Sequence, residues 1–130
     1  MIVPDTSVWI DHIRNRSTPG VRKLRDLNTI DQIIIGDLVL TEVLQGARDE
    51  TDAARLEADM RQFPIVSMVD NALAVKAARC YRVMRSFGFT VRKIADLYIG
   101  TFCIENSYDL VHSDTDYDAM EKFCGLRVLH

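Results

Sequence analysis

Cysteine and proline are both scarce in this chain of 130 residues. It has three cysteines, three prolines and an aromatic content of 8%. Cys80, Cys103 and Cys124 are odd in number and form no C-x-x-C pair, which argues against a disulfide framework and a structural zinc site. Each cysteine lies among apolar residues, so we expect all three to be reduced and to act as small hydrophobic side chains.

No hydrophobic run is long enough for a membrane helix, which needs roughly 18 residues. The longest near-apolar run, Leu97 to Ile104, has eight residues and already includes a glycine and a threonine. The first 15 residues carry Asp5, Asp11 and Arg14 in place of the apolar core of a signal peptide. With 48% hydrophobic residues and a net charge of −3, the composition is that of a folded globular protein. We therefore expect one cytoplasmic domain over residues 1–130.

Positive charge is not in excess overall, but it is concentrated in one segment. The 16 Lys and Arg residues are outnumbered by 19 Asp and Glu residues, which argues against binding of nucleic acid through bulk charge. Residues 71–95, by contrast, contain six cations and no acid. This segment is either a solvated helix face or a surface that follows a phosphate backbone. The candidate phosphate contacts are Arg79, Arg82, Arg85, Arg92 and Lys93.

Short aliphatic runs alternate with longer segments of helical periodicity. The runs predict strands at 2–4, 33–35, 65–68, 110–112 and 126–129. The periodicity predicts helices at 6–14, 19–27, 38–44, 51–62, 71–86, 92–106 and 117–123. Asp37 is the expected N-cap of the third helix, which stops at Gly46. The alternation favours a single α/β domain in which helices cover both faces of a short parallel sheet.

Acidic residues follow two of the predicted strands. Asp5 comes directly after the first strand, and Asp114 follows the strand at 110–112, with Asp116 two residues further on. The functional groups of a parallel sheet gather at the carboxyl ends of its strands, where these residues lie. The alternative is that Asp5 is only the N-cap of the next helix and Asp114 only a turn residue.

Asp96 and Glu42 are isolated charges in apolar helical segments. The helix around Asp96 is apolar on nearly every side, which predicts that it is buried. A buried carboxylate is unfavourable unless it is paired, protonated or bound to a metal ion. Lys93, three residues earlier, is a candidate partner for Asp96, and Glu42 is alternatively a surface residue.

In a parallel sheet four of these acids can converge at one edge, namely Asp5, Glu42, Asp96 and Asp114. Carboxylates packed together repel one another, so some of them protonate unless a cation joins them. The hard cation that suits several carboxylates is Mg²⁺, or Mn²⁺ in its place, whereas His12 and His112 lack the spacing of a zinc site. Such an ion suits phosphoryl chemistry because it lowers the pKa of bound water and shields the charge of a phosphodiester.

Four segments resemble the motifs of PIN-domain nucleases, and of the VapC-type toxins in particular. They are residues 1–11 (MIVPDTSVWID), 40–46 (LTEVLQG), 95–100 (ADLYIG) and 110–118 (LVHSDTDYD). They occur in family order over nearly the whole chain. The resemblance implies a three-layer α/β/α PIN-like domain with a short parallel sheet of four to five strands. It also implies a Mg²⁺-dependent endoribonuclease that is the toxin of a type II toxin–antitoxin pair.

The resemblance also implies roles for individual residues. Those that match the family's catalytic acids are Asp5, Glu42, Asp96 and Asp114. Asp5, Asp96 and Asp114 would hold the metal ion, with Asp116 as an auxiliary ligand. Ser7 matches a position that orients the site, and Glu42 would position the attacking water or bind a second metal ion.

The chain departs from the family pattern at two positions. Gly100 stands where alanine is usual, and Tyr117 stands where phenylalanine is usual. Neither departure is expected to touch a ligand.

The partners implied by the resemblance are an RNA substrate, a small antitoxin from the same operon and a second copy of the chain. Residues 37–63 carry more apolar side chains than one core face needs, which predicts either a groove for an antitoxin helix or additional core. The residues of this predicted groove are Leu38, Val39, Val43, Leu44, Leu56 and Met60.

Three other functions compete with a ribonuclease. An aspartyl phosphatase usually has a second acid two residues after its nucleophile, and Ser7 at that position disfavours it. A DNA-directed nuclease of the same fold is closer, although a short chain without added DNA-binding elements favours RNA. A non-catalytic PIN-like interaction module would not need all four acids.

Overall fold

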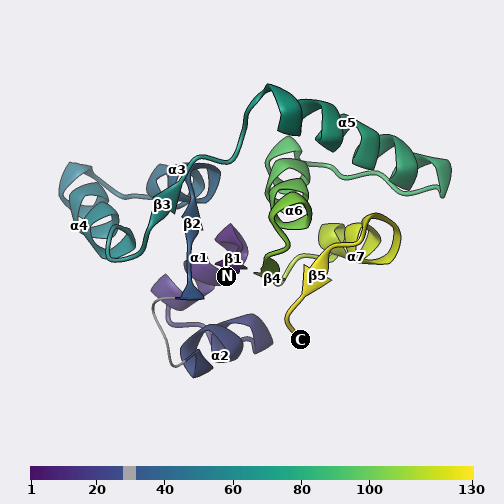
Figure 1. The fold of residues 1–130 in the computed structure, drawn as a ribbon. Helices are drawn as coiled ribbons and strands as arrows, with labels where there is room; N and C mark the ends of the chain where they lie inside the picture. The colour runs from purple at the N-terminus through teal and green to yellow at the C-terminus, as the bar shows by residue number, and fades with distance from the viewer. Residues whose placement is uncertain (28–31) are drawn as a thin grey trace.

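Three short parallel strands bring the two ends of the chain together (Figure 1). The computed structural model describes residues 1–27 and 32–130. β1 (Ile2–Pro4), β4 (Asp109–Val111) and β5 (Arg127–Val128) form a sheet in the order β1-β4-β5. β1 pairs with β4 in parallel, and β4 pairs with β5 in the same direction.

The two remaining strands form a separate parallel pair, β2 (Ile35–Gly36) with β3 (Ile65–Val66). A single parallel bridge between Ile2 and Ile33 joins this pair to the edge of β1. All five predicted strands are therefore present, but as sheets of three and two strands rather than one continuous sheet.

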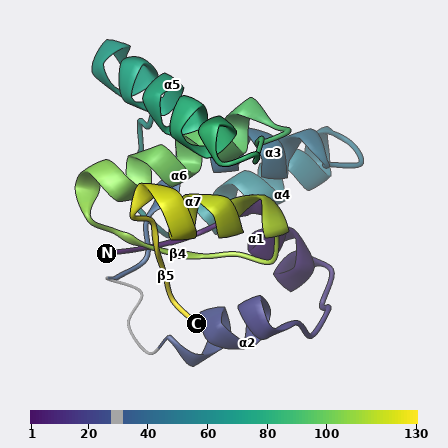
Figure 2. The same ribbon diagram turned by 90° about the vertical axis from the view of Figure 1, so that its right-hand side faces the viewer.

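Helices cover both faces of the strands. They are α1 (Thr6–Ile13), α2 (Pro19–Asp26), α3 (Asp37–Gln45), α4 (Glu50–Met60), α5 (Asn71–Ser86), α6 (Ile94–Asn106) and α7 (Asp118–Cys124), with the 3₁₀ turn η2 (Thr115–Tyr117) before α7. Figure 2 shows α6 and α7 on one side of β4 and α2 on the other. α5 packs on α6 and α7, while α1 packs on α2 and α3. The predicted α/β/α layering is confirmed, and each of these helix ends lies within two residues of its predicted position.

Helix starts follow from side chains that accept backbone N–H groups. Asp5, Thr18, Asp49 and Asp70 each cap a helix in this way. The predicted cap of α3 was wrong by one residue, because Gly36 is the N-cap and Asp37 is already helical. The Asp37 carboxylate instead accepts from the backbone of Met68 at 3.1 Å, which ties α3 to the segment after β3.

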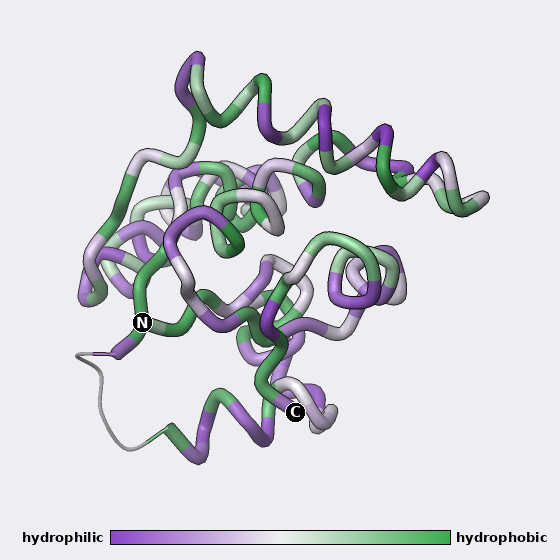
Figure 3. Tube along the Cα trace, turned by 45° about the vertical axis from the view of Figure 1, so that its right-hand side comes forward, coloured by the Kyte–Doolittle hydropathy of each residue, from purple (hydrophilic) through white to green (hydrophobic). Residues whose placement is uncertain are grey.

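The amphipathic pattern of α5 places its apolar stripe in the core. Figure 3 shows alternating hydrophobic and hydrophilic bands along this helix. Leu73, Ala77 and Met84 are buried, and so is Cys80. All three cysteines are free, as expected. Among the described residues, no helix combines the length and apolar character that crossing a membrane requires.

Packing against α7 explains the glycine at position 100. A Cβ atom added to Gly100 would collide with the side chain of Met120, which is completely buried. Met120 thus fills the space that an alanine methyl group takes in the usual family pattern. This departure concerns the core and leaves the acidic residues untouched.

Candidate active site

The carboxyl ends of β1 and β4 lie side by side and begin the candidate site. The backbone N–H of Asp5 donates to the carbonyl of Val111 at 2.8 Å, so Asp5 follows the end of β1 directly and lies beside the last residue of β4. A pocket of about 200 Å³ opens here, and its acidic lining comes from four elements or their ends. The residues lining it are Asp5, Thr6, Ser7, Ile10, Glu42, Gln45, Lys93, Asp96 and Asp114.

Asp5 is both the N-cap of α1 and the most enclosed acid of the pocket, with 3% of its surface exposed. Its Oδ2 atom accepts from the Ser7 backbone N–H at 3.1 Å and from the Ser7 hydroxyl at 2.7 Å. The two interpretations of Asp5 are therefore compatible, because the cap fixes the carboxylate at the floor of the pocket. Ser7 therefore contacts an acid of the pocket directly.

Asp96 is buried in the first turn of α6, as its apolar neighbours predicted, with 5% of its surface exposed. Its Oδ2 atom has no hydrogen-bond partner among the described residues. Burial, followed by the nearby charges of Asp5 and Asp114, raises the pKa of this carboxyl from 3.8 to about 7. Lys93 lowers that pKa through its charge, but it forms no ion pair with Asp96 in the described structure.

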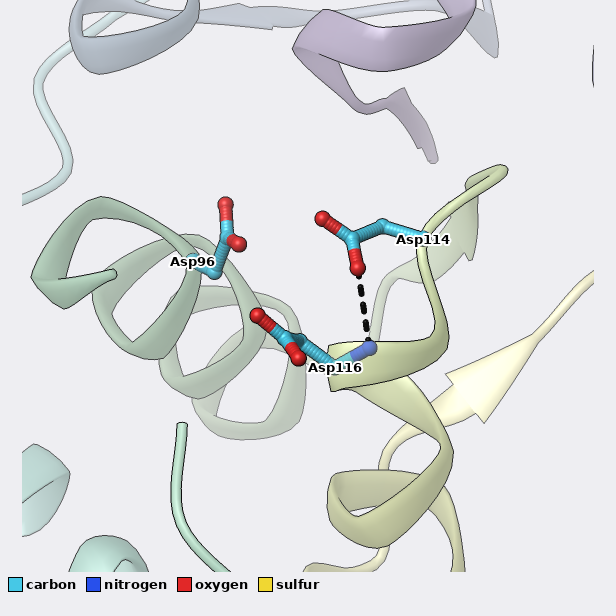
Figure 4. A group of neighbouring side chains, drawn as sticks. All are labelled: Asp96, Asp114 and Asp116. Carbon is cyan, nitrogen blue, oxygen red and sulfur yellow. Dashed lines mark hydrogen bonds between the residues drawn. The ribbon is translucent and has the colours of Figure 1, made fainter. Parts of the chain in front are cut away.

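Asp114 and Asp116 approach Asp96 from the opposite wall. Figure 4 shows the three side chains pointing toward a common space between α6 and η2. One carboxylate oxygen from each lies within 4.8 Å of the others. Asp114 accepts from the Asp116 backbone N–H at 2.9 Å, so the turn alternative is also correct and sets the spacing of the two acids.

Glu42 reaches the same pocket from α3 and is half-buried. Its Oε1 atom accepts from the hydroxyl of Thr6 at 2.7 Å. Glu42 is therefore not a free surface residue but an acid held in place across the pocket from Asp96.

Tyr117 is a site residue that sequence reasoning missed. Its ring is completely buried, and its hydroxyl lies 2.7 Å from Oδ1 of Asp5 and 3.4 Å from Oδ1 of Asp96. Burial and the adjacent charges of Asp5 and Asp96 raise the pKa of this phenol well above its usual value. The hydroxyl therefore stays protonated and donates a hydrogen bond to Asp5. The expectation that this departure touches no predicted ligand was wrong, because Tyr117 contacts both Asp5 and Asp96.

The residues present fit a hard divalent cation. Two buried carboxylate oxygens, Oδ2 of Asp96 and Oδ2 of Asp116, lack a partner among the described residues. Both acids belong to the group of three whose oxygens gather within 4.8 Å. Buried carboxylates normally find hydrogen-bond donors or a cation, and all-oxygen donor sets are those of Mg²⁺ and Mn²⁺.

The candidate phosphate contacts divide into two groups. Lys93 lines the acidic pocket, and Arg92 donates to Asp116 at 3.3 Å, so both lie at the site. The other three, Arg79, Arg82 and Arg85, are exposed along α5. The structure thus brings only two of the five predicted cations to the acids.

The predicted antitoxin groove is only partly present. Val39 is completely buried, and Leu38 and Leu44 line none of the described hollows around α1 and α4. Val43 and Leu56 line one hollow of about 410 Å³, and Leu56 and Met60 line a second of about 400 Å³. We refer to these two as the α1–α4 hollows. Their remaining apolar lining comes from α1 and, in the second hollow, also from Phe63; the prediction named none of these residues.

The chain is similar to known proteins along almost its entire length. The family model described as PIN domain matches residues 2–123. Ribonuclease VapC11 of Mycobacterium tuberculosis is 31% identical over 130 residues, which cover 98% of this chain and 96% of that protein. The crystal structure of FitAcB from Neisseria gonorrhoeae has a TM-score of 0.77 at 18% identity, covering 100% of this chain and 97% of that one. VapBC2 from Rickettsia felis, solved with a promoter DNA fragment, has a TM-score of 0.77 at 17% identity, covering 99% and 98%.

Proposed function

Because the chain belongs to the PIN domain family and has a ribonuclease among its full-length relatives, we propose that it is a metal-dependent endoribonuclease and the toxin of a type II toxin–antitoxin pair. One observation carries the catalytic part of this proposal. The Asp96 carboxylate is buried next to Asp114 and Asp116 and keeps one oxygen without a partner among the described residues. A buried acid without a partner does not stabilise the fold, and acids in such environments cluster at functional sites.

The residues of the pocket have different roles in this proposal. Asp5, Asp96 and Asp114 would hold Mg²⁺, or Mn²⁺ in its place, with Asp116 completing the set. When bound, the ion supplies a water of lowered pKa and shields the charge of the phosphodiester. Glu42, which Thr6 holds at the pocket wall, orients the attacking water. Lys93 at the rim attracts the phosphate.

Cleavage of a labelled, structured RNA by the purified chain tests this proposal. We expect cutting with Mg²⁺, no cutting with EDTA, and little cutting of a DNA strand of the same sequence. Equal cutting of DNA would favour the DNA-directed nuclease instead. If Mg²⁺ neither supports cleavage nor raises the melting temperature, the chain is a non-catalytic interaction module.

We further propose that the α1–α4 hollows receive a segment of the antitoxin. The first hollow has an apolar floor that includes Ile13 and Leu56, and three arginines stand at its edge. Asp52 holds two of them, accepting from Arg55 at 2.6 Å and from Arg48 at 3.4 Å. This combination suits an amphipathic segment that carries acidic residues.

Ile13→Glu is expected to weaken antitoxin binding by about tenfold or more, because it puts a charge into the apolar floor. Ile13 is 41% exposed, so the change should leave the fold intact. Calorimetry measures binding of the proposed antitoxin, the small protein expected from the same operon. Val69→Glu, at a site with 43% exposure outside the hollows, is the matched control and should bind normally. Equal binding by both variants would rule out this location.

The homodimer implied by the resemblance also remains a proposal. Exposed apolar side chains on and after α5 offer a surface for it, namely Val75, Phe87, Phe89 and Ile94. Light scattering of the purified chain should then give twice the mass of one copy.

A further inference from the structure

The hydroxyl of Tyr117 lies between the two most buried acids of the pocket. It donates to Oδ1 of Asp5 at 2.7 Å, and Oδ1 of Asp96 is 3.4 Å away. These residues come from three places in the chain: the end of β1, the first turn of α6 and the turn η2. A single O–H group therefore lies within 3.4 Å of a carboxylate oxygen of each of these two acids.

Packing alone does not account for this hydroxyl. The ring of Tyr117 lies against His112, with 5.0 Å between the ring centroids, and a phenylalanine ring would fill the same space. The usual family residue at this position is a phenylalanine. Burying a phenol without a hydrogen bond is unfavourable, so the oxygen is tolerated because its O–H group donates a hydrogen bond to Asp5.

The hydroxyl completes the fixation of Asp5. Ser7 supplies two donors to Oδ2, and Tyr117 supplies one donor to Oδ1, so both oxygens of the carboxylate are held. Asp96 has no comparable support, because its Oδ2 lacks a partner among the described residues. Without Tyr117, the Asp5 carboxylate would be held from one side only and would face Asp96 with no proton between them.

We propose that Tyr117 is a positioning residue that fixes the orientation of the Asp5 carboxylate beside Asp96, and so prepares it to bind a divalent cation. The inference rests on the proposed metal-dependent function. The mechanism is the one by which outer-shell hydrogen bonds orient metal ligands in other proteins. Tyr117 itself contacts neither the RNA nor the reacting water.

Titration of Mg²⁺ and Mn²⁺ into Tyr117→Phe, followed by calorimetry, tests the proposal without any substrate. The dissociation constant should rise about tenfold, because outer-shell changes cost this much or more. In cleavage assays, excess metal should restore much of kcat, and KM for the RNA should not change. Tyr108→Phe is the matched control, since the Tyr108 hydroxyl makes no hydrogen bond within the described residues and the ring only packs on Phe102.

The outcomes separate this inference from the function it rests on. If the unsubstituted protein binds no divalent metal, the proposed function fails and the role of Tyr117 fails with it. If that protein binds metal and Tyr117→Phe binds it equally well, only the positioning role is overturned. A lower melting temperature with an unchanged metal affinity would likewise mean that the hydroxyl is merely structural.

A second measurement covers the case in which Tyr117→Phe does not fold. The chain has four tyrosines, so a variant with phenylalanine at 81, 98 and 108 retains Tyr117 alone. Adding Mg²⁺ to that variant should change the near-ultraviolet absorption of tyrosine, because the charge beside its hydroxyl changes. Metal binding without such a change would overturn the proposal.

Discussion

Asp96→Asn is expected to reduce RNA cleavage by at least about 100-fold, a larger loss than changes to outer-shell residues produce. The amide has the shape of the carboxylate but lacks its charge, so the variant tests the charge alone. Asp96 faces Asp114 and Asp116 on the opposite wall of the pocket, and one of its carboxylate oxygens lies within 4.8 Å of an oxygen of each. The measurement is the rate of cleavage at saturating Mg²⁺, with wild-type and variant proteins purified identically.

Asp118→Asn is the matched control for this substitution. Asp118 is exposed at the start of α7, two residues beyond Asp116, and its loss changes the net charge by the same amount. This control should cut RNA at close to the normal rate. If Asp96→Asn also cuts normally, either the active site lies elsewhere in the chain or the activity belongs to a contaminating protein.

Mg²⁺ is expected to stabilise the protein much more at pH 8 than at pH 5. Asp96 has a pKa of about 7 in the folded, metal-free protein but about 3.8 when unfolded. Between these values the folded state binds more protons than the unfolded chain, so stability falls as the pH rises from about 4 to 7. We expect a loss of roughly 1–3 kcal/mol over that range in EDTA. A bound cation reverses it, because the ion favours the charged carboxylates, and a concentration of 100 times Kd adds about 2.7 kcal/mol.

Thermal melting at several pH values, in EDTA and in Mg²⁺, checks this expectation. The Asp96→Asn variant should show a flatter pH profile in EDTA and a smaller response to Mg²⁺, since it cannot lose the proton in question. A wild-type profile that rises from pH 4 to 7 in EDTA would contradict the prediction. So would an equal effect of Mg²⁺ at both ends of the range.

Most of the fold was predictable because its signals are local. The apolar stripe of α5 and the charged residues between its members define that helix without reference to the rest of the chain. Asp96 was also predictable, since a single acid in an otherwise apolar helix is either paired or functional. The cap of α3 was misplaced because both Gly36 and Asp37 suit a helix start, and only the contact of Asp37 with Met68 decides between them.

The parts that could not be predicted depend on contacts between distant segments. Tyr117 lies 112 residues from Asp5 in the sequence, and a buried tyrosine usually means only a larger core side chain. The predicted antitoxin groove included Val39 because helical spacing cannot tell the two apolar faces of α3 apart. The walls contributed by α1 emerge only when that helix is packed on α3.

Ile10 of α1 lies between the acidic pocket and the first α1–α4 hollow. Its side chain lines the acidic pocket on one side and the first α1–α4 hollow on the other. The two spaces are therefore neighbours that share one residue of α1 as a partition. A polypeptide bound in the hollow would lie one side chain away from the acids. Any replacement of Ile10 would therefore change the lining of both spaces at once.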